Sequence, residues 1–287
     1  MALDKRSVNQ ERETLIAQAL ETPEGRVALA QAMVEPIRRA LEYQAVGRKL
    51  LMVDELPQGA YARYEKDVRA TATVISRRGA VPDMIIEGEE ILVPTFEIAT
   101  NPTVRISEVK ARRFYIVDRA QIKAKEAIQK EEDSNIFNAI NAAVPAANQV
   151  ISTGGALSTS ALGQAFASVE QHDLTVGKVV CHALRYNDIR NWGKTVYDEA
   201  TQKEVLTTGL FGHIWTADIH VSSRVTPKYV FVLSLAEYVG AMPIRQDITV
   251  LPADDPKKLR LGWIIYEEIG ITVINDYAIA RIEVKSA

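Results

Sequence analysis

The chain has 287 residues, of which 47% are hydrophobic and 25% charged, a composition ordinary for one large globular domain or two smaller ones. Its 34 basic and 37 acidic residues give a formal net charge of -3 and are mixed along the chain, which excludes the concentrated basic surface of a tight nucleic-acid binder. The single cysteine, Cys181, excludes an internal disulfide, and the absence of a long apolar run or signal sequence predicts a soluble, intracellular protein.

Two short helices are predicted in the N-terminal segment. The sequence LETPEGR separates them, with Thr22 as the N-cap of the second helix and Pro23 in its first position. Apolar residues recur at three- and four-residue steps from Val27 to Leu41. This stripe must dock on another part of the fold, because it cannot bury itself.

A charged β arm follows. Alternation from Tyr61 to Ile75 predicts a strand, RRGAVPD provides turn chemistry, and the segments 91–98 and 104–115 predict the returning strands. The arm has too few apolar residues to form a core of its own. Its charged residues include Glu65, Lys66, Asp67, Arg69, Arg77, Arg78, Glu87, Glu89 and Glu90.

A long helix is predicted next, with Asp118 as its cap and about 26 residues free of Gly and Pro before Val144 and Pro145. At 1.5 Å per residue it spans ~40 Å. Its first half is charged and its second half apolar, so only one end should be deeply packed. The pattern favours a spine helix rather than a member of a bundle.

The remaining sequence predicts a compact α+β region. Helical spacing at Leu162, Phe166 and Val169 precedes short alternating strands and helices in KVVCHA, LRYNDIRNW, HIWTADIHVSS and YVFVLSLAEYV. The residues 252–258 form a turn, and WIIYEEIGITVI and YAIARIEV predict two final strands.

Two fragments, VGKVV and WGKTV, have the Gly-Lys pair of a phosphate-binding loop. Each lacks the first glycine of that loop, which is replaced by His172 and by Asp188. In HIWTADIH, the spacing of His213, Asp218 and His220 does not place all three on one face of a strand. The sequence therefore predicts no nucleotide site and no metal site.

No catalytic pair is predicted either. Cys181 and His182 are neighbours in an expected strand and point to opposite faces, so they cannot act as nucleophile and base. Glu267 and Glu268 lie between apolar runs, where an acid/base couple could lie, but interface or edge-strand charges explain them equally well. We expect no catalytic residues and no cofactor, and hence a protein that acts through its shape.

The order of these parts resembles the Hong Kong 97 fold of the major capsid proteins of tailed double-stranded DNA phages, a fold that encapsulins share. The stretch EYVGAMPIRQDITVLPADDPKKLRLGWIIYEEIGITVINDYAIARIEV is similar to the end of the axial domain and its return to the peripheral domain in those subunits. The resemblance implies an N-terminal helical arm at 1–48, an extended β loop with peripheral-domain strands at 49–116, a spine helix at 117–147, an axial domain at 148–256 and peripheral return strands at 257–287.

By the same resemblance, the chain would be a structural protein that assembles as pentamers and hexamers into an icosahedral shell. The shell would enclose double-stranded DNA without sequence-specific binding, and the β loop, with its charged residues as contacts, would lie over a neighbouring subunit. The expected partners are further copies of the chain, a separate scaffold protein, a portal and a decoration protein, with no membrane. The protein would be found in the virion after assembly in the host cytoplasm, without covalent crosslinks.

Three alternatives stay open. One is an encapsulin-type compartment that loads a cargo enzyme. Another is a soluble α+β enzyme with a site around Cys181, His182, Asp188 and His213, in which the β arm is a lid or dimer clasp. The third is a minor decoration or scaffold-like protein of the phage head.

Overall fold

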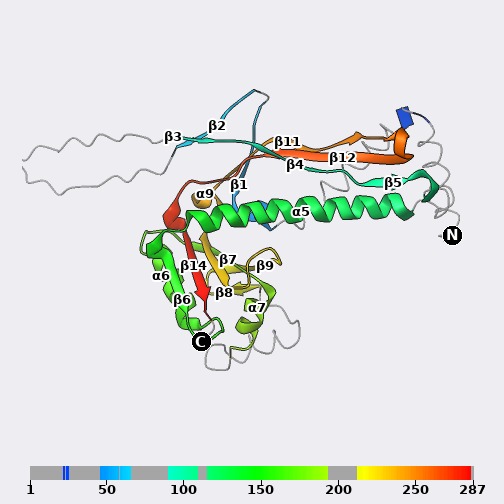
Figure 1. Ribbon diagram of the computed structural model, residues 1–287. Helices are drawn as coiled ribbons and strands as arrows, with labels where there is room; N and C mark the ends of the chain where they lie inside the picture. Colours follow the sequence, from blue (N-terminus) through cyan, green and yellow to red (C-terminus); the bar gives the residue numbers. More distant parts are fainter. Residues whose placement is uncertain are drawn as a thin grey trace, which may run out of the picture. The chain divides into compact units, whose positions relative to one another are not determined.

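The computed structural model describes residues 46–57, 59–65, 90–108, 115–192 and 212–285, together with Thr22, Glu24 and Gly25. The chain divides into two compact units (Figure 1). The first comprises Met1–Arg48, Thr95–Ile136 and Ile244–Ile269; the second comprises Lys49–Pro94, Phe137–Pro243 and Gly270–Ala287. No helix within the described ranges combines the length and apolar character needed to cross a membrane.

In its described residues, the first unit is an antiparallel sheet with the first part of a long helix along it. Strand β12 (Arg260–Ile269) pairs with β11 (Gly240–Pro252) on one side and with β4 (Phe96–Thr100) and β5 (Thr103–Arg105) on the other. The first part of α5 (Tyr115–Ala143) runs along this sheet (Figure 1). A small core joins helix and sheet, formed by Ala124, Ile128, Ile248, Val250, Leu261, Trp263 and Ile265.

Alternation along β12 determines which side chains enter that core. Leu261, Trp263, Ile265, Glu267 and Ile269 are buried, whereas the residues between Trp263 and Ile269 that alternate with them are more exposed. Because successive side chains in a strand point to opposite faces, the carboxylate of Glu267 is carried into the interior with its apolar neighbours.

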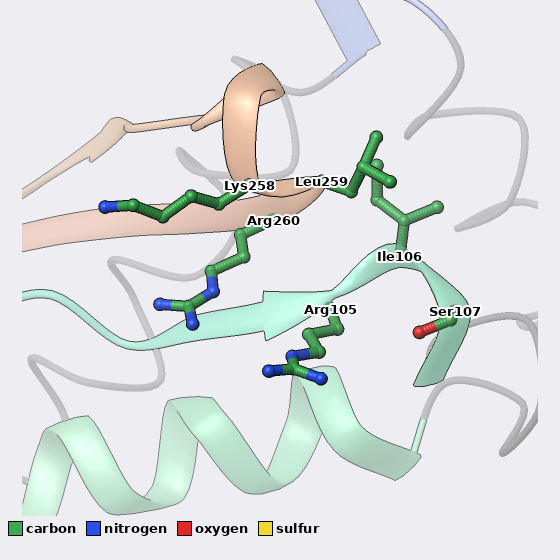
Figure 2. A pocket seen from close by; sticks show the side chains of 6 residues that line it. All are labelled: Arg105, Ile106, Ser107, Lys258, Leu259 and Arg260. Atoms are coloured by element: carbon green, nitrogen blue, oxygen red, sulfur yellow. The ribbon is translucent and has the colours of Figure 1, made fainter.

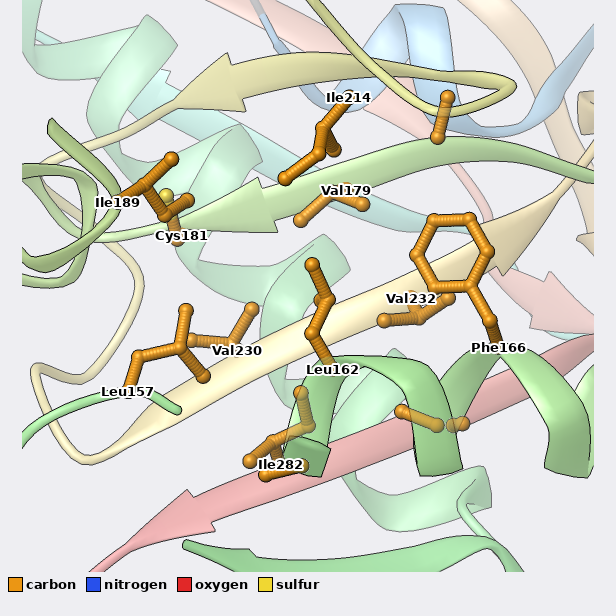
Figure 3. Packing of buried hydrophobic residues seen from close by; sticks show 14 of the residues in the cluster. Leu157, Leu162, Phe166, Val179, Cys181, Ile189, Ile214, Val230, Val232 and Ile282 are labelled. Atoms are coloured by element: carbon orange, nitrogen blue, oxygen red, sulfur yellow. The ribbon is translucent and has the colours of Figure 1, made fainter. Parts of the chain in front are cut away.

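The second unit contains a mixed sheet whose described strands follow the order β6-β14-β10-β7-β9-β8. Helix α6 (Thr159–Glu170) packs its buried face on this sheet, and Leu162 and Phe166 point toward Val179, Val230 and Val232 (Figure 3). The strands are β6 (Gln149–Ser152), β14 (Ile279–Val284), β10 (Tyr229–Ser234), β7 (Val176–Cys181), β9 (Ala217–Val221) and β8 (His213–Ile214).

Short elements complete the described structure. They are α3 (Gly47–Leu50), β1 (Met52–Glu55), η1 (Ala146–Asn148), α7 (Ala183–Arg190), α9 (Ala236–Val239), η2 (Pro256–Lys258), β13 (Thr272–Val273) and η3 (Asp276–Ala278). The root of the β arm is the ladder of β2 (Ala62–Glu65) and β3 (Glu90–Val93). The rest of the predicted arm and most of the predicted N-terminal helices lie outside the described residues. The predicted cap is present, because the Gly25 amide donates to Thr22 Oγ1 at 3.1 Å.

The long helix and the α+β pattern are confirmed, with corrections at three boundaries. The helix begins at Tyr115, so Asp118 lies inside it and is not its cap. The strand predicted over 104–115 ends at Arg105, where its partner β12 begins with Arg260, and Ile106–Glu108 are helical. His182 is not in a strand: it caps α7, its Nδ1 accepting from the Leu184 amide at 3.1 Å.

The predicted border between 256 and 257 does not coincide with the sheets. It falls inside η2, the turn that joins β11 to β12. Strand β14, placed by the sequence with the peripheral return strands, lies between β6 and β10 in the sheet of the second unit. Its buried Ala280 and Ile282 are part of the apolar core of that unit.

Candidate assembly surfaces

The root of the β arm carries unbalanced charge. Glu65 and Glu90 are directly opposite in the β2–β3 ladder, and both are exposed. Arg63 reaches Glu90 only loosely, with Nη1 3.8 Å from Oε2. Of the charged residues predicted to make contacts, these two glutamates alone are described; Lys66, Asp67, Arg69, Arg77, Arg78, Glu87 and Glu89 lie outside the described residues.

The inner face of the arm root is anchored to β1. Ala62 is buried, and the Tyr64 hydroxyl donates to Asp54 Oδ2 at 3.0 Å. Partial burial, followed by this hydrogen bond and the negative charge of Asp54, raises the pKa of Tyr64. Arg63 and Glu65 alternate with these residues and face outward. The anchored face therefore holds the charged face in a fixed orientation.

A hollow of about 310 Å³ lies beside the arm root, lined by Glu65, Glu237, Tyr238, Ile274 and Asn275. Glu65 and Glu237 are exposed, and Tyr238 is 45% exposed. We call Glu65, Glu90, Glu237 and Tyr238 the acidic surface. Two carboxylates beside an aromatic ring are suited to a guanidinium group.

The first unit has a basic counterpart where β5 meets the β11–β12 turn. A hollow of about 700 Å³ is lined by Arg105, Ile106, Ser107, Lys258, Leu259 and Arg260 (Figure 2). Arg105 and Arg260 are directly opposite in the β5–β12 ladder. Leu259 has φ 52° and is 67% exposed, so the turn projects an apolar side chain beside the cations. We call these six residues the basic hairpin end.

A third charged group is internal and joins α3, α5, β11 and β12. Arg48 Nε is 2.9 Å from Glu132 Oε1, and Arg48 Nη2 is 3.0 Å from Glu267 Oε2. Asp247 lies at 3.9 Å from Arg48 Nη1. Nearby, the Gly47 amide donates to Asp133 Oδ1 at 2.9 Å. These contacts fasten residues 47 and 48 to the helix and the sheet.

Burial dominates the electrostatics of this group. Both glutamates are fully buried, and among the described residues neither Glu132 Oε2 nor Glu267 Oε1 has a hydrogen-bond partner. Burial, reinforced by repulsion from Glu132, raises the pKa of Glu267 to about 8, and burial also raises the pKa of Glu132. For Arg48, burial acts to lower the pKa, but the surrounding carboxylates raise it overall.

The interpretation of Glu267 and Glu268 as edge-strand charges was wrong. Strand β12 is interior, with β11 and β4 on its two sides, and Glu267 is sealed within the unit. Glu268 faces the other way, where it accepts from Thr95 Oγ1 and from Arg245 Nη1 at 2.8 Å. The sequence could have indicated that Glu267 is buried, because alternation along the strand WIIYEEI places it on the same face as Trp263 and Ile265.

The residues of the predicted enzyme alternative have structural partners instead of a shared site. Cys181 is buried, and burial, with a smaller contribution from Asp188, raises the pKa of its thiol to about 12. Asp188 accepts from the Leu157 amide and from Arg185 Nη1. His213 pairs with Asp218 at 2.9 Å on the surface. In the described part of the chain, no group of His, Cys, Asp and Glu could hold a metal ion.

No protein-family model and no curated protein matches the sequence. Solved structures do match the fold. A structure from Microbacterium phage Oxtober96 has a TM-score of 0.64 at 12% identity, covering 84% of this chain and 91% of the other. The capsid of Cyanophage P-SCSP1u matches with a TM-score of 0.64 at 12% identity, and the match covers 85% of this chain and 89% of the other. The virus-like particle from Pyrococcus furiosus matches with a TM-score of 0.60 at 17% identity, and the match covers 87% of this chain and 98% of the other. The α+β fold predicted from the sequence, of the Hong Kong 97 type, is thereby confirmed.

Proposed function

We propose that the chain is the major capsid protein of a tailed double-stranded DNA phage. Copies assemble as pentamers and hexamers into an icosahedral shell around the packaged genome. The observation that carries this proposal is the fold shared with a Microbacterium phage structure over 84% of the chain and with a cyanophage capsid over 85% of it. Neighbouring copies supply the repeated contacts, so many modest interfaces close the particle.

The surfaces of the chain support this proposal. The described root of the predicted arm is the two-stranded ladder of β2 and β3, and a two-stranded ribbon is marginally stable in water without a partner. The basic hairpin end and the acidic surface carry exposed charges of opposite sign on different units. A net charge of -3 is compatible with a shell that encloses DNA without binding it tightly. A separate scaffold protein, a portal and a decoration protein complete the proposed assembly, which forms in the host cytoplasm and ends in the virion.

Expression of the chain alone tests the proposal. Negative-stain microscopy and light-scattering mass should show shells, tubes or rings with five- or six-fold outlines. A homogeneous monomer or dimer at every concentration, with or without candidate scaffold proteins, would overturn it. A ladder of covalent oligomers on a reducing denaturing gel would contradict the proposed absence of crosslinks.

The arm can be tested separately. The deletion should span Lys66 to Glu89, with a short Gly-Ser turn joining β2 to β3. A deletion continuing through 98 would also remove most of β4, which pairs with β12. The variant should fold, with unchanged circular dichroism, and fail to assemble. Normal particles from this variant would show that the arm is not needed.

A compartment that holds protein cargo is the second candidate, favoured by the match to the virus-like particle, which covers 98% of that chain. Nuclease-treated particles distinguish the two functions when they are purified from cells that also express the neighbouring genes. Protected double-stranded DNA supports the phage capsid. A stoichiometric co-purified enzyme, with no protected DNA, supports the compartment.

A further inference from the structure

The basic hairpin end holds two arginines whose charges no described residue compensates with an ion pair. Arg105 and Arg260 are register partners in the β5–β12 ladder, and like charges directly opposite repel each other. Neither forms an ion pair with any residue in the described part of the chain. Lys258 has a local partner, Asp255, at 3.2 Å across the turn. Among the described residues, the arginine pair therefore has no anionic partner, and the anionic group that it would bind is to be sought on another molecule.

The walls of the hollow indicate what kind of group enters. Figure 2 shows Arg105 and Arg260 side by side, with Leu259 and Ile106 forming an apolar wall at one end. Leu259 is held outward at 67% exposure by a left-handed backbone. Phosphate groups alone would need only the cations. An apolar wall beside a charge pair suits a folded protein surface, which combines carboxylates with apolar side chains.

The acidic surface on the other unit has the matching chemistry. Glu65 and Glu90 are also a like-charged register pair, which Arg63 offsets only weakly from 3.8 Å, and Glu237 adds a third carboxylate at the hollow beside them. Tyr238 exposes its ring there, and Ile274 contributes apolar lining. Arginine binds carboxylates through paired hydrogen bonds and stacks on aromatic rings. Each surface thus holds a repulsive pair that the other would neutralise.

We propose that the basic hairpin end of one copy docks on the acidic surface of a second copy. The inference rests on the proposed shell function, for which it names one contact between subunits. The two surfaces differ, so the contact is heterologous: each copy offers one of each, and the contact propagates from copy to copy instead of ending at a dimer. Arg105 and Arg260 enter beside Glu65, Glu90 and Glu237, and Leu259 packs near Tyr238.

Charge reversal tests the contact. One variant carries Arg105→Glu and Arg260→Glu, a second carries Glu65→Arg and Glu90→Arg, and a third carries all four changes. Circular dichroism and thermal melting establish that each variant folds. Sedimentation velocity then gives the chain concentration at half assembly. Each double variant should require at least about tenfold more protein, because like charges then meet across the contact.

The variant with all four substitutions is the decisive test of the contact, because it restores opposite charges across the contact with their positions exchanged. It should assemble at a concentration within about threefold of the wild-type value. Arg224→Glu with Lys228→Glu is the matched control: it replaces two cations, both exposed and outside the two proposed surfaces, with carboxylates and should leave assembly unchanged. If the variant with all four substitutions assembles no better than either double variant, the proposal is overturned.

Other outcomes separate the contact from the shell function. Wild-type particles together with normal assembly of both double variants would refute the contact and leave the shell intact. Loss of enclosed nucleic acid with normal assembly would assign the arginines to phosphate and overturn the proposal. Small wild-type oligomers that the reversals abolish would support the contact and refute the shell. A wild-type chain that never self-associates would refute both.

Discussion

Replacing Glu267 with glutamine should stabilise the folded chain at alkaline pH and flatten the pH dependence of its stability. The Glu267 side chain is fully buried, with Oε2 at 3.0 Å from Arg48 Nη2. Its other oxygen has no hydrogen-bond partner among the described residues, and Glu132 shares the same arginine. One guanidinium cannot offset two buried carboxylates, so the site holds a proton at neutral pH.

The sign follows from proton linkage. The pKa of Glu267 is raised from 4.5 to about 8 on folding, so the folded chain keeps a proton that the unfolded chain releases within that interval. This contribution to stability is fully present below pH 4.5, falls as the pH rises, and is lost above about pH 8. The slope is about 1.4 kcal/mol per pH unit for one proton. Because Glu132 is coupled to Glu267, the proton belongs to the pair.

Glutamine keeps an oxygen that can accept from Arg48 and stays neutral at every pH. Urea unfolding of the unassembled chain, followed at pH 5.5, 6.5, 7.5 and 8.5, should give similar free energies of unfolding for both proteins at the lowest pH. At pH 8.5 the glutamine variant should be more stable by about 3.5 kcal/mol, the product of the slope and the interval from pH 5.5 to 8.

Glu267→Asp is the control, since it shortens the side chain but keeps a carboxyl group in the site. It should lower stability at all pH values and retain the downward slope. Curves for wild type and Glu267→Gln that run parallel from pH 5.5 to 8.5 would refute the reasoning, because they would mean that no proton is held at this position.

Three further predictions concern the second unit. Gly240→Ala should lower the free energy of unfolding by about 1 to 3 kcal/mol in urea titrations, because its methyl group would overlap the Thr272 carbonyl oxygen across β11 and β13. The thiol of Cys181, buried and with a pKa of about 12, should not react with a disulfide reagent at pH 8 until denaturant is added. Ser158→Ala should cost about 1 kcal/mol, measured as a lower urea midpoint, because Ser158 Oγ accepts from the Ala161 amide at 3.2 Å.

Local patterns in the sequence were sufficient for the regular elements. The run without Gly and Pro predicted the spine helix, which extends over 29 residues as α5. The spacing of Leu162, Phe166 and Val169 predicted α6, whose buried face contains all three residues. These predictions succeeded because helix periodicity and breakers act within a few residues of each other.

The charged sites could not be predicted in this way. Arg48 meets Glu132 and Glu267 across separations of 84 and 219 residues, so only the packed structure brings them together. The pairing of Arg105 with Arg260 depends on the register of β5 against β12, which no short pattern specifies. The dense charges of the arm were predicted to contact a neighbouring subunit. Most of them lie outside the described residues, so these contacts stay a prediction.

The placement of charge distinguishes the interior of this chain from its surfaces. Inside the first unit, Arg48 is surrounded by carboxylates and the excess negative charge is limited by a retained proton. On the surface, Arg105 faces Arg260 and Glu65 faces Glu90, which is unfavourable for a chain that remains alone. Register could have set opposite charges against each other in either ladder. The β5–β12 ladder instead pairs two cations and the β2–β3 ladder pairs two anions. Contacts between copies therefore explain this arrangement better than the stability of a single copy does.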